Sequence, residues 1–196
     1  AFQNCSSLKK VTIPCGVERL SKDVFRDCHS LKTVNVPDSL RHICFGAFEN
    51  CAITTMELPA GVEKFTGGSF LGCVSLKTLT VAEGNIRYRS ENGMVYDDID
   101  RKLVLCPAGK GANRVEVAPG TVSIGKCAFT KCTGLKEVVL PESLKKIGAS
   151  AFVYCEDLEN IIFSEGLEEI CYGAFAYCGS LRKIDVPDSL RKMGDY

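Results

Sequence analysis

Cysteine is the residue of this chain whose number and spacing most readily suggest chemistry. The 196-residue sequence holds twelve cysteines. In a small secreted protein this number predicts a disulfide scaffold, and in other settings a zinc site or a reactive thiolate. Seven of the twelve, however, lie three residues after a phenylalanine at nearly constant intervals: Cys5, Cys28, Cys51, Cys73, Cys132, Cys155 and Cys178. We call these seven the cysteine column, because they share one position of a repeat.

Buried packing is the role we favour for the cysteine column, since free cysteine behaves as a small buried hydrophobe. Disulfides between neighbouring repeats remain an alternative, because adjacent strands lie about 4.8 Å apart, within the Cα separation that a bridge accepts. Zinc is not favoured: no C-x-x-C pair is present, and His29 and His42 are the only histidines. The other cysteines lie outside the column: Cys15, Cys44, Cys106, Cys127 and Cys171.

Three aspartates in one short segment, Asp97, Asp98 and Asp100, are the other group with metal-binding chemistry. Carboxylate oxygens bind calcium, but a calcium loop also carries a bidentate glutamate after the acidic turn, and none follows here. We therefore interpret the segment as a solvated loop that holds no metal. We expect no cofactor.

Enzymatic chemistry finds little support. The sequence has no G-x-S-x-G, P-loop or G-x-G-x-x-G motif. Cys28 and His29 are neighbours, but Cys28 belongs to the cysteine column, where a buried thiol is unreactive. Lys plus Arg equals Asp plus Glu at 24 each, so no global field attracts nucleic acid. No apolar run approaches the roughly 18 residues of a membrane helix. We therefore predict a non-enzymatic protein that neither binds nucleic acid nor inserts into membranes.

The repeat itself predicts the fold. Intervals of 23, 23, 22, 59, 23 and 23 residues separate the recurring phenylalanines. A fixed period of this size is typical of a solenoid, in which each repeat, or rung, buries its apolar face against its neighbours. The phenylalanines are Phe2, Phe25, Phe48, Phe70, Phe129, Phe152 and Phe175.

Each rung divides into three parts. A Leu-x-x-Val-x-Val segment, such as 158–163, alternates apolar and polar residues at its end and predicts a half-buried strand. The second half, such as 167–170, predicts a short extended segment whose first and last side chains point into the core. The Gly-x-x-Ala-Phe-x-x-Cys segment is too short for a full helix and predicts a single helical or 3₁₀ turn. The predicted strand segments are 8–13, 31–36, 53–58, 76–81, 135–140, 158–163 and 181–186.

Residues 85–114 interrupt the repeat. Residues 93–96 and 102–105 predict two strands of a β-hairpin with a polar tip at 97–101. We expect residues 1–196 to form one elongated domain, an α/β-type solenoid of about 23-residue rungs with short parallel strands, interrupted by this hairpin. We also expect the chain to be part of a longer array, because its first and last residues fall within a repeat.

Polar residues, threonine above all, dominate the outward positions of the predicted strands, as suits an exposed sheet. Val139 and Ile162 are the exception, because both are apolar and share one register on neighbouring rungs. Exposed apolar neighbours can mark a contact site. We therefore predict that Val139 and Ile162 anchor a protein partner, with Glu137 and Asn160 as the polar rim. The hairpin tip at 96–101 is the alternative site.

The run from Ile124 to Pro141, Ile-Gly-x-x-Ala-Phe-x-x-Cys-x-x-Leu-x-x-Val-x-Leu-Pro, resembles the BspA-like leucine-rich repeats of bacterial and protist surface proteins. The interruption is similar to a variant in that family, in which the segment at 92–96 precedes a strand ending in proline, here Pro107. The sequence departs from this pattern at single positions. Val24 and Ser69 stand in place of the alanine, Cys44 and Cys171 in place of the glycine, and Ala82 and Ser164 in place of the proline.

The resemblance implies a leucine-rich repeat stack without shared catalytic residues. It also implies an extracellular or cell-surface protein that adheres to host matrix proteins or other cells, although AFQNCSSLKK at the start has no signal-peptide core. A structural spacer that holds another domain away from the cell is the alternative. The sequence of the parent protein would separate the two, because a spacer needs an adjacent functional module.

Overall fold

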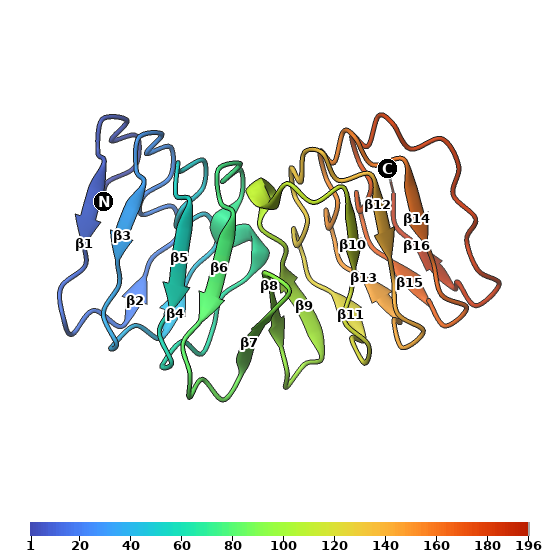
Figure 1. The fold of residues 1–196 in the computed structure, drawn as a ribbon, viewed down its shortest axis with the longest axis horizontal. Helices are drawn as coiled ribbons and strands as arrows, with labels where there is room; N and C mark the ends of the chain where they lie inside the picture. The colour runs from blue at the N-terminus through green and yellow to red at the C-terminus, as the bar shows by residue number, and fades with distance from the viewer. Residues whose placement is uncertain (196) are drawn as a thin grey trace.

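Two rows of short parallel strands run along the computed structural model, which describes residues 1–195. Figure 1 shows the rungs following one another along the long axis, with the chain termini at opposite ends. The first row holds β1 (Lys10–Thr12), β3 (Thr33–Asn35), β5 (Thr55–Leu58), β6 (Thr78–Val81), β10 (Arg114–Glu116), β12 (Glu137–Val139) and β14 (Asn160–Ile162). The second row holds β2 (Arg19–Leu20), β4 (His42–Ile43), β9 (Lys102–Leu105), β11 (Ser123–Ile124), β13 (Lys146–Ile147), β15 (Glu169–Ile170) and β16 (Lys192–Met193).

Strand pairing keeps the register that the repeat predicts. Val138 of β12 lies opposite Ile161 of β14, and Ile147 of β13 lies opposite Ile170 of β15. These inward residues are buried, and the polar residues between them face outward. The predicted solenoid of about 23-residue rungs is therefore confirmed.

One predicted strand is absent. Residues 181–186 are extended but form no strand, and Ile184 and Val186 remain exposed. A single neighbour is not the reason, because β1 and β16 also pair on one side only; this segment differs from β1 in burying little of its apolar side chains at Ile184 and Val186. The helical part of each rung is also slight. The described chain has only two 3₁₀ helices, η1 (Gly67–Phe70) and η2 (Ala108–Lys110), and other rungs turn at the Ala-Phe position without a helix.

Stacked phenylalanine rings fill the core. Phe129, Phe152 and Phe175 stack at centroid distances of 4.6 and 5.2 Å. A second stack joins Phe2, Phe25, Phe48 and Phe70 at 5.3 to 5.7 Å. The core accordingly forms two clusters, one on each side of the interrupted segment.

Cys106 stands where the phenylalanine series is broken. Its backbone N–H donates to the carbonyl oxygen of Ala128 at 2.8 Å, as the N–H of Phe129 does to Ala151 one rung later. Cys106 therefore occupies the phenylalanine register without a ring. The 59-residue interval is therefore two steps, 36 residues from Phe70 to Cys106 and 23 residues from Cys106 to Phe129, and the longer step contains most of the interruption.

The cysteine column is buried over most of its length, as predicted. The members of the inner rungs are buried, whereas Cys5 is exposed and Cys178 half-buried, and all twelve cysteines are free thiols. Six thiols of the column donate to the carbonyl oxygen at the phenylalanine position of the preceding rung, at 2.9 to 3.6 Å. The phenylalanine carbonyls among these acceptors also accept a backbone N–H, as Phe129 does from Cys132, so the thiol supplies a second hydrogen bond as well as filling space.

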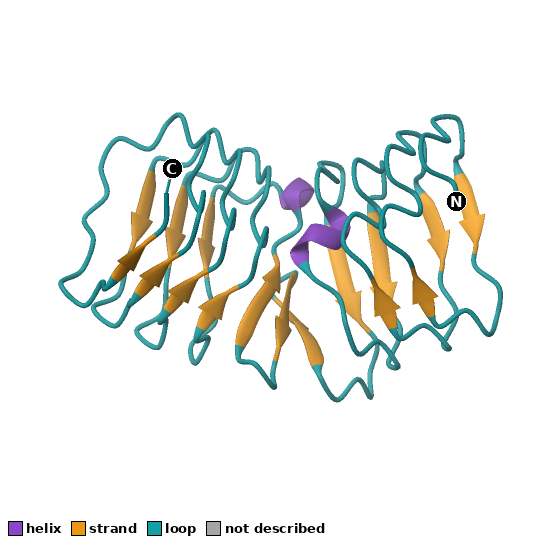
Figure 2. Ribbon diagram, turned by 180° about the vertical axis from the view of Figure 1, so that it is seen from behind, coloured by secondary structure: helices purple, strands orange, loops and turns teal. Residues whose placement is uncertain are grey.

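The interrupted segment forms a three-stranded antiparallel unit in the second row. The predicted hairpin is present as β8 (Met94–Asp97) and β9, and β7 (Tyr88–Glu91) adds a strand that the sequence did not predict. β9 also pairs in parallel with β11, so the unit is continuous with the solenoid. The array is bent, and β7, β8 and β9 lie on its convex side (Figures 1 and 2).

Candidate functional site

The predicted apolar pair lies on the outer face of the first row. Val139 and Ile162 are directly opposite each other in the β12–β14 ladder. Ile162 is 43% exposed, and Val139 is half-buried. The structure therefore brings the two side chains together, with the isoleucine as the more accessible of them.

A row of polar side chains borders this pair. Glu137 and Asn160 are also paired, and the Asn160 amide donates to a Glu137 carboxylate oxygen at 3.1 Å. Arg114 of β10 forms an ion pair with Glu137 from the other side and also holds Glu116 at 2.9 Å. Glu116 lies opposite Val139 and so closes one end of the apolar pair.

Arg114 and Glu116 are site residues that the sequence analysis missed. Arg114 is the last residue of the interruption predicted at 85–114, and Glu116 lies in none of the predicted strands, because no Ala-Phe precedes either at the repeat spacing. The run Arg114-Val-Glu-Val-Ala-Pro nonetheless alternates as the other strands do, with Val115 and Val117 buried. That alternation was the signal that could have identified β10.

The three aspartates of the acidic segment form ion pairs with arginine and lysine side chains of the same chain. Asp97, 1% exposed, pairs with Arg87 at 2.8 Å, Asp98 pairs with Arg89 at 2.7 Å, and Asp100 pairs with Lys102 at 3.0 Å. The hydrogen bond and charge of Lys102 lower the pKa of Asp100. Tyr96, placed at the hairpin tip in the alternative site, is buried inside β8 instead. Only 98–101 form the exposed tip.

The buried thiols are poorly suited to nucleophilic chemistry. Burial raises the pKa of Cys73 to about 12 and that of Cys178 to about 12, and it also raises the pKa of Cys51. A thiol with a raised pKa is a poor source of the reactive thiolate. Over residues 1–195, no group of three or more His, Cys, Asp or Glu is arranged to hold a metal ion.

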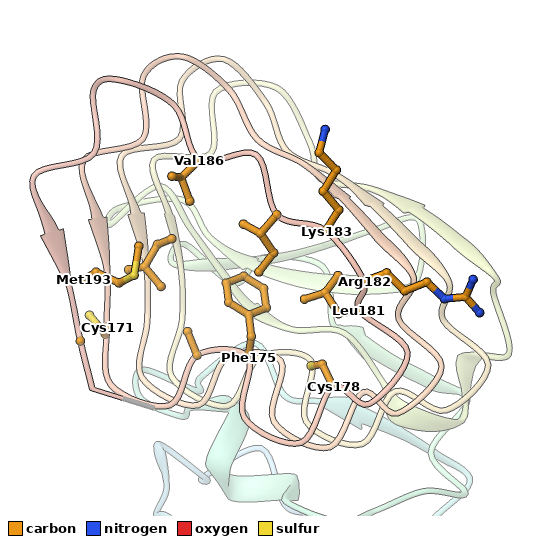
Figure 3. A pocket seen from close by; sticks show the side chains of 12 residues that line it. Cys171, Phe175, Cys178, Leu181, Arg182, Lys183, Val186 and Met193 are labelled. Atoms are coloured by element: carbon orange, nitrogen blue, oxygen red, sulfur yellow. The ribbon is translucent and has the colours of Figure 1, made fainter.

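A hollow of about 400 Å³ lies at the C-terminal rungs. Figure 3 shows Phe175, Leu181 and Val186 pointing into it, with Arg182 and Lys183 directed away. Phe175 stacks on Phe152 of the core, so the apolar lining continues the packed interior. The hollow presents no convergent polar groups and therefore no evident chemistry.

The comparisons identify the class of protein. The fold is a leucine-rich repeat solenoid, and a model of the BspA type leucine rich repeat region matches residues 1–94 and 109–196 in six copies. The chain therefore belongs to the BspA-type leucine-rich repeat family. The unmatched residues 95–108 hold most of β8 together with β9 and Cys106, where the rung departs from the family pattern.

Solved structures agree with this assignment. A leucine rich cell surface protein from Faecalibacterium prausnitzii is 32% identical, with a TM-score of 0.90 over 98% of this chain and 51% of its own. The pneumococcal vaccine antigen PcpA is 27% identical, with a TM-score of 0.88 over 95% of this chain and 47% of its own. The chain thus spans about half the length of either protein. A leucine-rich repeat protein from Eubacterium ventriosum, 15% identical with a TM-score of 0.55, shares the fold.

Curated protein sequences contain no match to this chain. Across residues 1–195, none of the helices has the length and apolarity that crossing a bilayer requires.

Proposed function

We propose that this chain is a non-enzymatic protein-interaction module of a cell-surface protein, adhering to host matrix proteins or to other cells. The family is one of interaction scaffolds, and a relative with 32% identity is described as a cell surface protein. An extracellular or cell-surface location follows from the same likeness.

The strand-face patch, Val139 and Ile162 with Glu137 and Asn160, is the contact site that we propose. Its backbone is fixed by ladder pairing on neighbouring rungs, so binding costs little ordering of the chain. The apolar centre lies between a satisfied polar row and Glu116. Apolar anchors surrounded by polar groups are how interfaces concentrate binding energy. This arrangement is the observation that carries the proposal.

Surface plasmon resonance against a panel of purified extracellular matrix proteins tests the proposal. Val139→Thr combined with Ile162→Thr keeps β-branching and so preserves the strands. We expect the affinity for the best matrix ligand to fall tenfold or more, equivalent to about 1.4 kcal/mol. The melting curve should not change.

Thr55→Val combined with Thr78→Val is the matched control, because these residues are also exposed and opposite each other on paired strands and the change keeps β-branching. It should leave both affinity and melting unchanged. If the Val139/Ile162 variant kept its affinity and its melting curve, the contact with the ligand would have to lie on another surface. A chain that binds no matrix protein and no cell would favour the second candidate, a rigid spacer, for which the continuous stacking of the rungs is the supporting observation.

A further inference from the structure

Two isoleucines project from the convex side of the array. Ile86, between β6 and β7, is 92% exposed, and Ile99, between β8 and β9, is 62% exposed. Isoleucine is among the residues most often buried completely, so exposure of this extent is unusual. Both loops belong to the unit β7–β9, which lies at the lower edge of Figure 1.

The loop that carries Ile86 is held by Asn85. The side-chain amide of Asn85 donates to the carbonyl oxygen of Val62 at 3.0 Å. Its side-chain oxygen accepts hydrogen bonds from the backbone N–H groups of Arg87 at 2.9 Å and Tyr88 at 2.8 Å. Ile86 therefore lies between Asn85 and Arg87, whose positions these hydrogen bonds fix.

The loop that carries Ile99 is held by buried Asp97. One carboxylate oxygen of Asp97 accepts from the backbone N–H groups of Ile99 at 3.1 Å and Asp100 at 3.0 Å. Its other oxygen pairs with Arg87 at 2.8 Å, and Arg87 also binds Asp100 at 2.9 Å. Arg87 therefore joins the two loops, and the isoleucines have a fixed relative position.

A hollow of about 490 Å³ lies beside the isoleucines. Ala60 and Val62 contribute apolar wall, and Ile86 and Ile99 line it as well. Arg41, on its rim, donates to the backbone carbonyl oxygens of Asp38 and Leu40. Over residues 1–195 Arg41 forms no ion pair, and Glu63, the carboxylate that also lines the hollow, lies 3.7 Å from the His42 ring.

We propose that this surface, the convex-edge site, is a second docking site that takes a protein segment presenting a large apolar side chain beside a carboxylate. The apolar side chain would enter the hollow between Ile86 and Ile99, and the carboxylate would pair with Arg41. The inference rests on the proposed role as an interaction module, but not on the strand-face patch.

Preorganisation and charge favour this partner. Apolar side chains on hydrogen-bonded loops lose little conformational freedom when they are covered, which leaves more of the burial energy for affinity. A guanidinium that forms no ion pair within its own chain can recognise a carboxylate in bidentate geometry. A hollow walled by two exposed loops accepts a side chain of a protein segment, whereas an enclosed small-molecule site buries most of its ligand.

Selection from a phage library of random linear peptides against the immobilised chain tests the site. Enriched peptides should combine a large apolar residue with Asp or Glu nearby. Their affinity, measured by fluorescence anisotropy, should fall at least tenfold in Ile86→Ser with Ile99→Ser, which is about 1.4 kcal/mol. Arg41→Gln should weaken binding of the acidic peptides and spare versions with Asn or Gln in place of the acid.

Val139→Thr with Ile162→Thr is the control, and it should leave peptide affinity unchanged. Peptides that lose affinity only in this control would assign binding to the strand-face patch and overturn the convex-edge site, without harm to the proposed function. No enrichment, or enrichment indifferent to Ile86 and Ile99, would also overturn it. Sedimentation velocity adds one more outcome: a dimer abolished by the Ile86/Ile99 variant would mean that a second copy occupies the site, and would refute the proposed partner.

Discussion

The thiol of Cys155 donates a hydrogen bond to the carbonyl oxygen of Phe129, 2.9 Å away and one rung earlier. Cys73 makes the same contact with Phe48 at 2.9 Å. The thiol is small enough to pack within the filled core and supplies a donor that other small hydrophobes lack. We infer that this double requirement explains the cysteine at this position in the six rungs where the bond forms.

Cys155→Ala should therefore cost more than its lost volume. The substitution leaves a small cavity and removes one of two hydrogen bonds to the carbonyl oxygen of Phe129, which keeps the bond from the Cys132 N–H at 3.1 Å. We therefore expect a loss of about 1–2 kcal/mol in the free energy of unfolding. Urea denaturation measures it. Cys15→Ala, at an exposed cysteine, is the control and should change stability by less than about 0.5 kcal/mol. Equal effects of the two substitutions would refute the hydrogen-bonding role.

The period of the sequence was sufficient to predict the register of the rungs, because residues at a constant spacing must lie above one another in a solenoid. β10 escaped prediction because Cys106 replaces the marker phenylalanine. β7 was not predicted because it pairs antiparallel with β8, which follows it directly, so it has no equivalent position in the repeat. The repeat spacing therefore predicts strands only in those rungs that keep the regular length and marker residues.

Side-chain exposure was less predictable. Val139 and Ile162 were recognised because their register is occupied by polar residues in most other rungs. Ile99 fell within the predicted hairpin tip at 97–101, but Ile86 could not be recognised, since an isoleucine between two predicted strands can equally belong to the core. Their exposure depends on how Asn85 and Asp97 direct the loops, which requires the three-dimensional contacts.

Alkylation under native conditions should distinguish the cysteines by exposure. Cys5 and Cys15 are exposed and should react, whereas Cys28, Cys51 and Cys155 are buried and should react slowly. Denaturation without reductant should make all twelve reactive, because they are free thiols. Peptide mass spectrometry reports each position. Cysteines that stay unlabelled after denaturation would be bridged, and the packing role of the column would be wrong.

Alkaline pH should destabilise the fold. Burial raises the pKa of Cys73 from its ordinary value of 9.0 to about 12 in the folded state. A raised folded pKa means that stability is complete below the unfolded pKa and declines as pH rises toward the folded pKa. The free energy of unfolding should therefore fall as pH rises from about 9 toward about 12, measured by urea denaturation with reductant. Cys73→Val should flatten this dependence, and an unchanged slope would exclude Cys73 as its source.

Phe152→Ala should be among the most damaging single substitutions. Phe152 is fully buried and stacks on both Phe129 and Phe175. Its removal should cost about 3–5 kcal/mol. Because stacked rungs couple mainly to their neighbours, hydrogen exchange should accelerate most in the C-terminal cluster. Tyr154→Ala, at an exposed ring two residues away, is the control. Uniform acceleration from the first rung to the last would instead indicate one globally cooperative core.

Asp97 should be essential to the irregular rung, in contrast to its neighbour Asp98. Both carboxylates pair with an arginine at 2.7 to 2.8 Å, but Asp97 is buried while Asp98 is exposed. Replacing one partner of a buried ion pair leaves the other charge poorly solvated, at about 3–5 kcal/mol. Arg87 keeps partial access to water, so we expect Asp97→Asn to cost roughly 2–3 kcal/mol.

Asp98→Asn is the matched control, because exposed ion pairs contribute about 0–1 kcal/mol. Urea denaturation gives both values, and hydrogen exchange over 85–101 locates the effect. Asparagine keeps the oxygen that accepts from the N–H groups of Ile99 and Asp100 but loses the ion pair with Arg87. Because Arg87 joins the two loops of the convex-edge site, hydrogen exchange in both loops should become faster. Peptide binding there should then weaken although no contacting side chain has changed. Equal stability of the two variants, with unaltered exchange in these loops, would show that Asp97 does not hold the isoleucines in place.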